Sequence, residues 1–276
     1  MKFIASISFG KDSLAMLLKL LELNYPLDEV VYFDIGVEFD SIRNNAERMK
    51  PILSEKGIEF TILYPKESFI YNMTERPVRK RKGECQKGWL WCGGNARWGT
   101  GMKLEAIAEN NAKYGEEMIV EYVGVASDER LRINRDRQGN RVKIYPLVEC
   151  GMTEKDCLDY CYQQGYDWQE YEPILDKYIR LYDILPRVSC WCCRNKNLDE
   201  LRNYYHYLPS YWNRLKEMQC KLPCDPMKKA SGSVFDLEKR YMLEDKWIAD
   251  GREKEIRSKK FFEELKMKLK EENRKE

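Results

Sequence analysis

The stretch Phe3 to Leu21, FIASISFGKDSLAMLLKLL, places a short polar loop between an apolar run and a helix. β-Branched and aromatic residues in 3–7 predict a buried strand, and leucines at helical spacing predict the helix. The start of a helix offers unpaired N–H groups and the positive end of a dipole, to which residues 8–13 add hydroxyls and an ammonium. The stretch therefore predicts an anion-binding corner. The alternative is that Asp12 or Ser13 merely caps the helix after a glycine turn.

Short apolar runs alternate with amphipathic segments along the first 165 residues. This alternation predicts βαβ units and a mostly parallel sheet, whose ligands bind beyond the carboxyl ends of the strands. Ser8 and Asp34 would both lie at that edge. The further strands are expected at 30–35, 58–63 and 118–125, with a last one ending at Tyr145-Pro146-Leu147. The helices are expected over about 41–56, kinked at Pro51, over 102–112, and over 153–164 after a capping-box-like start at Thr153 and Asp156.

The remaining segments are less regular. Residues 65–101 form a connection too long for an ordinary loop, and Arg135 to Arg141, which contains Asp136 and a Gln138-Gly139-Asn140 turn, predicts an exposed hairpin or flap. Aromatic residues in 204–212 are expected to pack between helices. We expect three parts: an α/β domain over 1–150, a helical cysteine-rich region over 151–250, and a charged helix or tail over 251–276.

The overall charge excludes a general attraction to nucleic acid or to anionic membranes. The chain of 276 residues has 48 Lys and Arg against 46 Asp and Glu, a formal net charge of +2. It has no apolar run of about 18 residues, and its N-terminus leads directly into a predicted strand rather than a signal peptide. These features predict a cytoplasmic protein without a membrane partner.

Ten cysteines and a single histidine, His206, direct attention to a thiolate metal site. Cys190 and Cys193 have the C-x-x-C spacing that lets two thiolates bind one metal. Cys85 and Cys92 could complete the set and order residues 65–101, which favours them slightly, but Cys220 and Cys224 are the open alternative. Structural zinc and a [4Fe–4S] cluster both accept four cysteines. For Cys150, Cys157 and Cys161, packing as small hydrophobic residues is the simpler interpretation.

The loop at Ser8 to Ser13 is not a Walker A motif, and it resembles the S-G-G-x-D-S loop of the PP-loop superfamily, the adenine nucleotide α-hydrolase-like proteins. Phe9 replaces the first glycine of that pattern. If the loop has the family shape, Phe9 must adopt a backbone conformation that glycine usually supplies; otherwise the turn differs slightly.

Five further segments, in the same order, resemble the phosphoadenosine phosphosulfate reductase-like branch of that superfamily over about residues 2–243. They are Phe33–Phe39 (D-T-G-x-E-F), Arg97–Lys103 (R-W-C-T-x-x-x-K), Gly124–Arg132 (G-x-x-x-x-E-S-x-R), Tyr145–Leu147 (the P-L segment), and Leu181–Arg187 with Ser189–Cys193 (L-Y-x-x-G-x-x-R-x-G-C-x-x-C). The C-terminal Glu-Cys-Gly-x-His motif of true reductases is absent, as is an early adjacent cysteine pair. The resemblance therefore points to phage- and prophage-associated members rather than to sulfonucleotide reductases.

The resemblance implies a Rossmann-like (HUP-type) α/β fold with a mostly parallel five-stranded sheet, flanking helices and a helical, cysteine-containing C-terminal part. It implies an enzyme that binds ATP or an adenylylsulfate-type nucleotide with Mg²⁺ and transfers an adenylyl group or sulfur at the α-phosphate, releasing AMP and pyrophosphate. The acceptor would be a nucleic acid or a protein. The alternative function is a nucleotide sensor or assembly subunit with a structural metal, and the oligomeric state stays open.

The resemblance also assigns site residues. Under this resemblance, the residues that hold the phosphates would be Ser8, Gly10, Lys11, Asp12 and Ser13. Asp34 and Gly36 would border the adenine and the ribose. The cationic wall of the site would consist of Arg97, Lys103, Arg130 and Arg132. Lys11, Asp12 and Lys103 are the expected catalytic residues, and Asp12 either braces the loop or holds Mg²⁺.

Overall fold

The computed structural model describes residues 1–80, 83–133 and 139–272, and it divides into two compact units. The first unit comprises Met1–Tyr71, Arg97–Glu170 and Arg180–Trp191, and the second comprises Asn72–Ala96, Tyr171–Ile179 and Cys192–Glu276. Each unit is therefore built from separate stretches of chain. The expected division at residues 150 and 250 stays a prediction.

The first unit contains a five-stranded parallel sheet, which confirms the expected Rossmann-like α/β fold. Its strands follow the order β3-β2-β1-β6-β7, with β1 at Lys2–Ile7, β2 at Glu29–Phe33, β3 at Glu59–Leu63, β6 at Ile119–Tyr122 and β7 at Arg141–Ile144. The chain moves from β1 outward to β3 and then continues at β6 on the other side of β1. The strand order thus reverses between β1 and β6, which is where ligands of such sheets bind.

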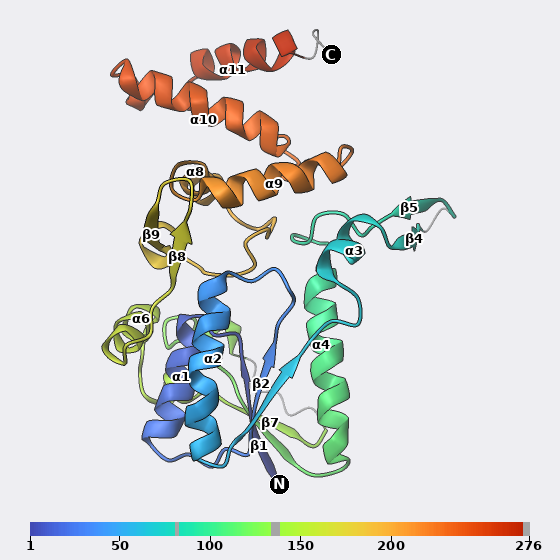
Figure 1. Cartoon of the computed structure of the whole chain (residues 1–276), viewed down its shortest axis with the longest axis vertical. Helices are drawn as coiled ribbons and strands as arrows, with labels where there is room; N and C mark the ends of the chain where they lie inside the picture. Colours follow the sequence, from blue (N-terminus) through green and yellow to red (C-terminus); the bar gives the residue numbers. More distant parts are fainter. Residues whose placement is uncertain (81–82, 134–138, 273–276) are drawn as a thin grey trace. The chain divides into compact units, whose positions relative to one another are not determined.

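Helices cover both faces of this sheet. Figure 1 shows α1 and α2 on one face and α4 on the other. On the α4 face, Ile4, Val31, Ile107 and Ile119 form a buried cluster. The helical elements of the unit are α1 (Lys11–Glu22), α2 (Asp40–Glu55, which includes Pro51), α4 (Trp98–Asn111), η1 (Ala112–Tyr114), η2 (Arg130–Arg132), α5 (Pro146–Glu149), α6 (Glu154–Gln163) and α7 (Leu181–Ile184).

The expected start of α6 is confirmed. Thr153 Oγ1 accepts the Asp156 N–H at 3.2 Å, and the Asp156 carboxylate accepts the Thr153 N–H at 2.9 Å. Cys157 and Cys161 are fully buried on this helix, as their hydrophobic interpretation predicts, whereas Cys150 is exposed.

The second unit is mostly helical, with two hairpins that the sequence analysis missed. The hairpins pair β4 (Pro77–Arg79) with β5 (Cys85–Lys87) and β8 (Gln169–Glu172) with β9 (Lys177–Arg180); α3 (Phe69–Thr74) and the β8–β9 pair straddle the boundary between the units. The helical elements are α8 (Leu198–Tyr207), α9 (Pro209–Lys221), α10 (Val234–Ala249), η3 (Glu253–Glu255) and α11 (Lys259–Glu272). Asp136 and Gln138 of the expected flap lie outside the described residues, and Arg141 begins β7.

Aromatic residues of the second unit pack between its helices, as expected for most of them. Tyr204 and Trp212 are buried, while Tyr207 is exposed. The charged C-terminal segment forms α11, which docks on α10 through Phe261 and Leu265 against Leu243 and Trp247.

A buried carboxylate connects the sheet to the end of α4. Glu29 of β2 has no exposed side-chain area, and it accepts hydrogen bonds from Lys113 Nζ at 2.8 Å, Tyr114 Oη at 2.7 Å, Thr61 Oγ1 at 2.5 Å and Asn110 Nδ2 at 3.2 Å. Burial alone would raise the pKa of Glu29, but these donors outweigh it and lower the pKa below its ordinary value.

We predict that Glu29→Ala lowers the free energy of unfolding by about 2–4 kcal/mol, because four donors lose one shared acceptor. Since the folded-state pKa is lowered, this contribution is complete above the ordinary carboxyl pKa and disappears as pH falls through the lowered value. Urea unfolding of both proteins between pH 3 and pH 7, pH values chosen to bracket that ordinary pKa, measures the effect. The control is Glu59→Ala, which removes a mostly exposed acceptor of the same Lys113 and should change stability by less than about 1 kcal/mol. Equal losses for the two variants would contradict the assignment.

Candidate functional site

The loop between β1 and α1 closes on itself through its two serines. The Ser8 N–H donates to Ser13 Oγ at 3.2 Å, the two hydroxyls lie 3.0 Å apart, and Ser13 Oγ donates to the Gly10 carbonyl at 3.1 Å. Gly10 precedes the first turn of α1 with extended backbone angles. The loop therefore holds its shape without a ligand.

Phe9 adopts the backbone conformation that a glycine would supply, with φ at +54°. Its ring is fully buried and meets Tyr32 edge-on at 5.1 Å and Phe60 at 6.0 Å, measured between ring centroids. The Trp168 indole N–H donates to the Phe9 carbonyl at 2.8 Å. Because the ring packs into the core on the sheet side, it does not close the loop to a ligand.

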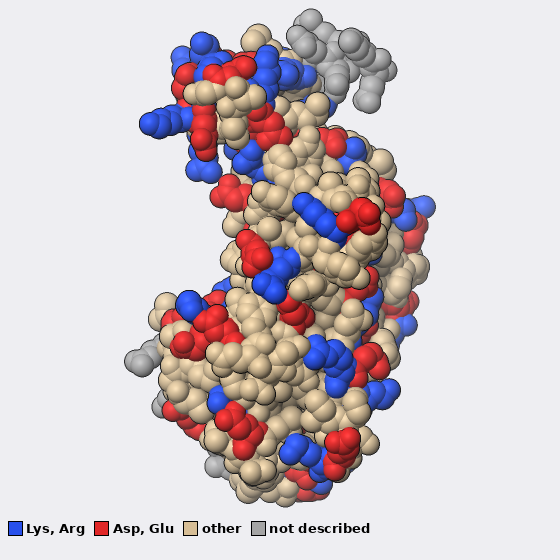
Figure 2. Space-filling view, turned by 60° about the vertical axis from the view of Figure 1, so that its left-hand side comes forward, with Lys and Arg blue, Asp and Glu red and all other residues tan. Residues whose placement is uncertain are grey.

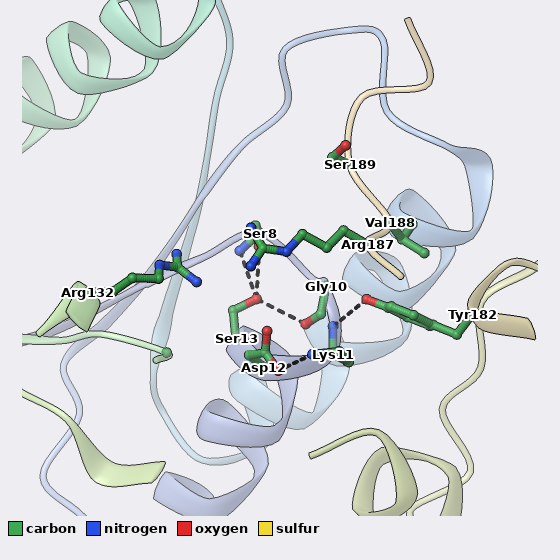
Figure 3. Close-up of a pocket in the computed structure, with 11 residues that line it drawn as sticks. Ser8, Gly10, Lys11, Asp12, Ser13, Arg132, Tyr182, Arg187, Val188 and Ser189 are labelled. Atoms are coloured by element: carbon green, nitrogen blue, oxygen red, sulfur yellow. Dashed lines mark hydrogen bonds and ion pairs between the residues drawn. The ribbon is translucent and has the colours of Figure 1, made fainter. Parts of the chain in front are cut away.

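A pocket of about 230 Å³ lies at the reversal of strand order, between the segments that follow β1 and β6. Figure 3 shows Arg132 and Arg187 reaching toward Ser8 and Ser13 from different segments, while the Tyr182 hydroxyl points at the start of α1. The lining residues are Ser8, Gly10, Lys11, Asp12, Ser13, Gly124, Arg132, Tyr182, Arg187, Val188 and Ser189.

Charged side chains around this pocket form one alternating series, which we call the charge chain: Arg132, Glu129, Arg187, Glu154, Lys11 and Asp12. Glu129 holds Arg132 through one carboxylate oxygen and Arg187 Nη2 through the other, the latter at 2.9 Å. Arg187 also lies 3.9 Å from Glu154, whose other oxygen is 2.8 Å from Lys11 Nζ. Lys11 Nζ reaches Asp12 Oδ1 at 2.7 Å. Three cations are thus matched by three carboxylates.

The charge chain shifts the ionisation of its members. Burial lowers the pKa of Lys11, but the hydrogen bonds and charges of Asp12 and Glu154 outweigh it and raise that pKa overall. Burial raises the pKa of Asp12 against the opposing effect of Lys11. At Glu129 burial is outweighed by the two guanidinium groups, so its pKa is lowered.

Lys11 and the two arginines differ in how far their side chains are exposed. The Lys11 side chain is only 7% exposed and its ammonium is taken by two carboxylates, whereas the side chains of Arg132 and Arg187 are 55% and 66% exposed. Lys11 therefore braces the loop, and the arginines are the more exposed cations beside the pocket.

Other residues expected at the site lie outside the pocket lining. Asp34 follows β2, where its carboxylate accepts the Gly36 N–H at 2.8 Å and pairs with Arg43 Nε at 3.0 Å. Arg97 is exposed at the start of α4, and Arg130 lies in η2.

Lys103 is half-buried on α4, without a hydrogen-bond or ion-pair partner among the described residues. Burial lowers its pKa, and the charges of Glu38, Cys190 and Glu121 oppose this only in part. A lysine in this state stabilises no part of the fold by pairing, so its charge is available to a ligand.

Several residues that line the pocket or pair with its lining were not assigned from the sequence. Gly124, Glu129, Tyr182 and Arg187 all lie inside segments that carry the family resemblance, but 111 or more positions along the chain separate them from the Ser8–Ser13 loop. The alternation of strands and helices predicts where the edge of the sheet lies, but it does not show which distant segments meet at that edge. Arg187 could have been assigned as a site residue, because it is the arginine that ends the motif at Leu181–Arg187.

The cysteines do not form a metal site in the part of the chain that the structure describes. Within residues 1–80, 83–133 and 139–272, no group of three or more His, Cys, Asp or Glu side chains could hold a metal ion. Cys85 is exposed on β5, as are Cys220 and Cys224 elsewhere in the second unit, and Cys92 and Cys193 are half-buried in the same unit. Cys190 belongs to the first unit. The Arg194 N–H, next to Cys193, donates to the Cys92 carbonyl at 3.1 Å, so these two segments lie together, and the ligand assignments stay predictions.

Charges on the visible face of the molecule are mixed. Figure 2 shows Lys and Arg interspersed with Asp and Glu on the face it displays. No helix among the described residues combines the length and the low polarity that spanning a bilayer requires.

Comparisons with known proteins leave the family open. No family model matches the chain, and no curated protein matches it. Among solved structures, the chain is similar to U34-tRNA thiolase NcsA from Methanococcus maripaludis, determined with its [4Fe-4S] cluster, at 12% identity and a TM-score of 0.42 over 88% of this chain and 71% of NcsA. A likeness this loose transfers neither residues nor activity to this chain.

We predict that Gly124→Ala weakens anion binding at the pocket about 10-fold or more and destabilises the protein by about 1–3 kcal/mol. An added Cβ would lie 2.8 Å from Ser13 Cα and 3.1 Å from Ser13 N, so the first turn of α1 would have to move. The matched control is Gly101→Ala in α4, where a Cβ meets no atom within 4 Å and should stabilise the helix by about 0.5–1 kcal/mol. Pyrophosphate titration calorimetry and thermal unfolding of both variants test this, and unchanged binding by Gly124→Ala would refute it.

We also predict that Lys103→Met stabilises the folded protein. A lysine whose folded-state pKa lies below its ordinary value disfavours folding fully below that lowered pKa, and this penalty disappears as pH rises toward about 10.5. The gain should therefore be largest near neutral pH and shrink at alkaline pH in urea unfolding. Lys66→Met, at an exposed lysine, serves as control and should leave stability close to that of wild type at every pH. A loss of stability for Lys103→Met at pH 7 would show that the amine is paired.

Proposed function

We propose that this protein is a PP-loop enzyme related to the phosphoadenosine phosphosulfate reductase-like branch. It would bind ATP or an adenylylated sulfonucleotide and transfer an adenylyl group or sulfur at the α-phosphate, with release of AMP and pyrophosphate. The observation that carries the proposal is the pocket at the β1–β6 reversal, where the N-terminus of α1 meets two arginines. The residues of the loop resemblance line that pocket.

The size of the pocket suits the charged part of a nucleotide. Sites for whole drug-sized ligands occupy about 300–1,000 Å³, and this pocket has about 230 Å³. We therefore place the phosphate chain in the pocket and the adenine and ribose beyond it, toward Asp34 and Gly36 at the end of β2. Arg97, Lys103 and Arg130 are proposed as further cations along the bound chain.

Phosphate oxygens would find donors of two kinds. The Asp12 and Ser13 N–H groups at the start of α1 have no hydrogen-bond partner among the described residues and belong to the pocket lining. The mostly exposed Arg132 and Arg187 supply guanidinium groups, each of which has N–H donors beyond those that Glu129 uses. Fixed amides hold the ground state, and the arginines neutralise the negative charge that gathers on the phosphoryl oxygens in the transition state.

Asp12 fits the expected Mg²⁺ ion. Its Oδ1 is taken by Lys11, but its Oδ2 has no partner among the described residues, and carboxylate oxygen is the ligand that Mg²⁺ prefers. A bound Mg²⁺ ion would neutralise phosphate charge. The role of Asp12 itself is to fix Lys11 on one side and to offer an oxygen ligand on the other.

One observation favours the second candidate function, a nucleotide sensor. The Lys11 ammonium is fixed by two carboxylates of the charge chain, so it is not free to act on a reacting phosphate. A pocket built this way suits binding without turnover. The nature of an acceptor or partner, nucleic acid or protein, stays a proposal in either case.

Incubation with ATP and Mg²⁺ tests the proposal. We expect AMP and pyrophosphate as products, and about a 100-fold loss of kcat/KM in Arg132→Ala, because one donor to the transition-state charge is removed. The control is Arg180→Ala, since Arg180 pairs with Asp167 outside the pocket and its loss should leave kcat/KM unchanged. ATP binding without product would establish the sensor, and failure to bind any nucleotide or pyrophosphate would refute both functions.

A further inference from the structure

A tyrosine that was not predicted as a site residue contacts the amino end of α1 from another segment. Tyr182 belongs to α7, lines the pocket, and its hydroxyl oxygen accepts the Lys11 N–H at 2.9 Å. The hydroxyl proton of Tyr182 has no acceptor among the described residues. A tyrosine hydroxyl can accept and donate at once, so one half of its hydrogen-bonding capacity is unused.

The serine hydroxyls of the loop, unlike that of Tyr182, use their protons for hydrogen bonds within the loop. Ser13 Oγ donates to the Gly10 carbonyl, and Ser8 Oγ lies within hydrogen-bond distance of Ser13 Oγ. Their protons are committed to the closed shape of the loop. Of the hydroxyls of Ser8, Ser13 and Tyr182, which meet at the start of α1, that of Tyr182 has the proton that the loop itself does not use.

The position of Tyr182 is fixed by its neighbours. Its ring meets the Trp168 ring edge-on at 4.9 Å with an interplanar angle of 90°, and the Trp168 indole N–H is bound to the Phe9 carbonyl. One tryptophan thus connects the tyrosine to the backbone of the loop. Figure 3 shows the Tyr182 oxygen directed at Lys11 and Gly10, at the end of the helix that faces the pocket.

The chemistry of the hydroxyl suits an oxyanion. The N–H that Lys11 donates to the oxygen polarises the O–H bond and strengthens it as a donor. Burial raises the pKa of Tyr182 above its ordinary value, so the group keeps its proton throughout the working pH range. It offers a neutral donor beside the charged arginines.

We propose that Tyr182 is a ligand-binding residue whose hydroxyl donates a hydrogen bond to a tetrahedral phosphoryl or sulfuryl oxygen seated at the start of α1. This inference rests on the proposed function and adds to it the residue that orients the anion. Arg132 and Arg187 supply attraction from partly exposed charged side chains, whereas Tyr182 supplies a fixed direction. The segment that contains α7 thereby becomes part of the binding site.

Titration calorimetry with pyrophosphate tests the inference in the full-length chain. Tyr182→Phe should raise the Kd for pyrophosphate about 10- to 100-fold, the usual range for a hydrogen bond to a charged group. The matched control is Tyr122→Phe, a buried tyrosine of β6 whose hydroxyl donates to the Pro26 carbonyl, and its Kd should equal that of wild type. If both variants bind like wild type, the inference is overturned while the proposed function stands. If wild type binds neither pyrophosphate nor ATP, the proposed function fails and the inference fails with it.

A second variant separates binding from folding, because Tyr182→Phe also leaves the Lys11 N–H without its acceptor. Tyr182→4-aminophenylalanine, introduced by amber suppression, restores a donor at the same place. Recovery of pyrophosphate affinity to within about 3-fold of wild type supports the direct hydrogen bond, a difference that corresponds to less than one hydrogen bond. Affinity as poor as that of Tyr182→Phe, in a protein whose thermal unfolding matches wild type, assigns Tyr182 a purely structural role and overturns the inference.

Discussion

The alternating charge chain around the β1–α1 loop is the interaction on which the site depends. Taken alone, three cations in a pocket of about 230 Å³ would repel one another and strain the loop. Glu129 and Glu154 lie between them, so each cation contacts an opposite charge before any ligand arrives. The pocket can therefore fold without its ligand. A bound anion does not have to break the chain, because each guanidinium has several N–H groups and Glu129 uses only part of them.

The backbone of the loop depends on packing at its rear. A non-glycine residue at φ +54° is less favourable by roughly 1 kcal/mol, and Phe9 offsets this by burying a complete aromatic ring against Tyr32 and Phe60. Trp168 adds a hydrogen bond to the Phe9 carbonyl and a ring contact to Tyr182. The departure from the family glycine thus moves a large side chain into the core and keeps the pocket side of the loop open. The resemblance could indicate the unusual conformation at Phe9, but the aromatic partners that tolerate it come from distant segments.

Features that depend on residues close together in the sequence could be predicted, whereas features that depend on contacts between distant segments could not. The strands and the capped helices were predictable because apolar periodicity and the Thr153–Asp156 box act within a few residues. The β8–β9 hairpin was missed because its strands have only four residues each and because the buried carboxylate of Glu172 also accepts a hydrogen bond from Ser210 in another segment, which no local pattern reveals. The loop end of the pocket and Arg132 could likewise be predicted from local motifs, whereas Tyr182 and Arg187, which come from a distant segment, could not.

The cysteines also show that spacing along the chain does not decide whether a site forms. A C-x-x-C spacing permits two thiolates to bind one metal, but a centre also needs further donors that reach it and that lose their protons easily. Cys85, Cys220 and Cys224 are exposed and belong to no ligand group among the described residues. Spacing along the chain thus identifies which cysteines could cooperate, and the protonation and placement of each thiol decide whether they do. The pocket meets the corresponding requirement for an anion, because its donors are already protonated and already converge.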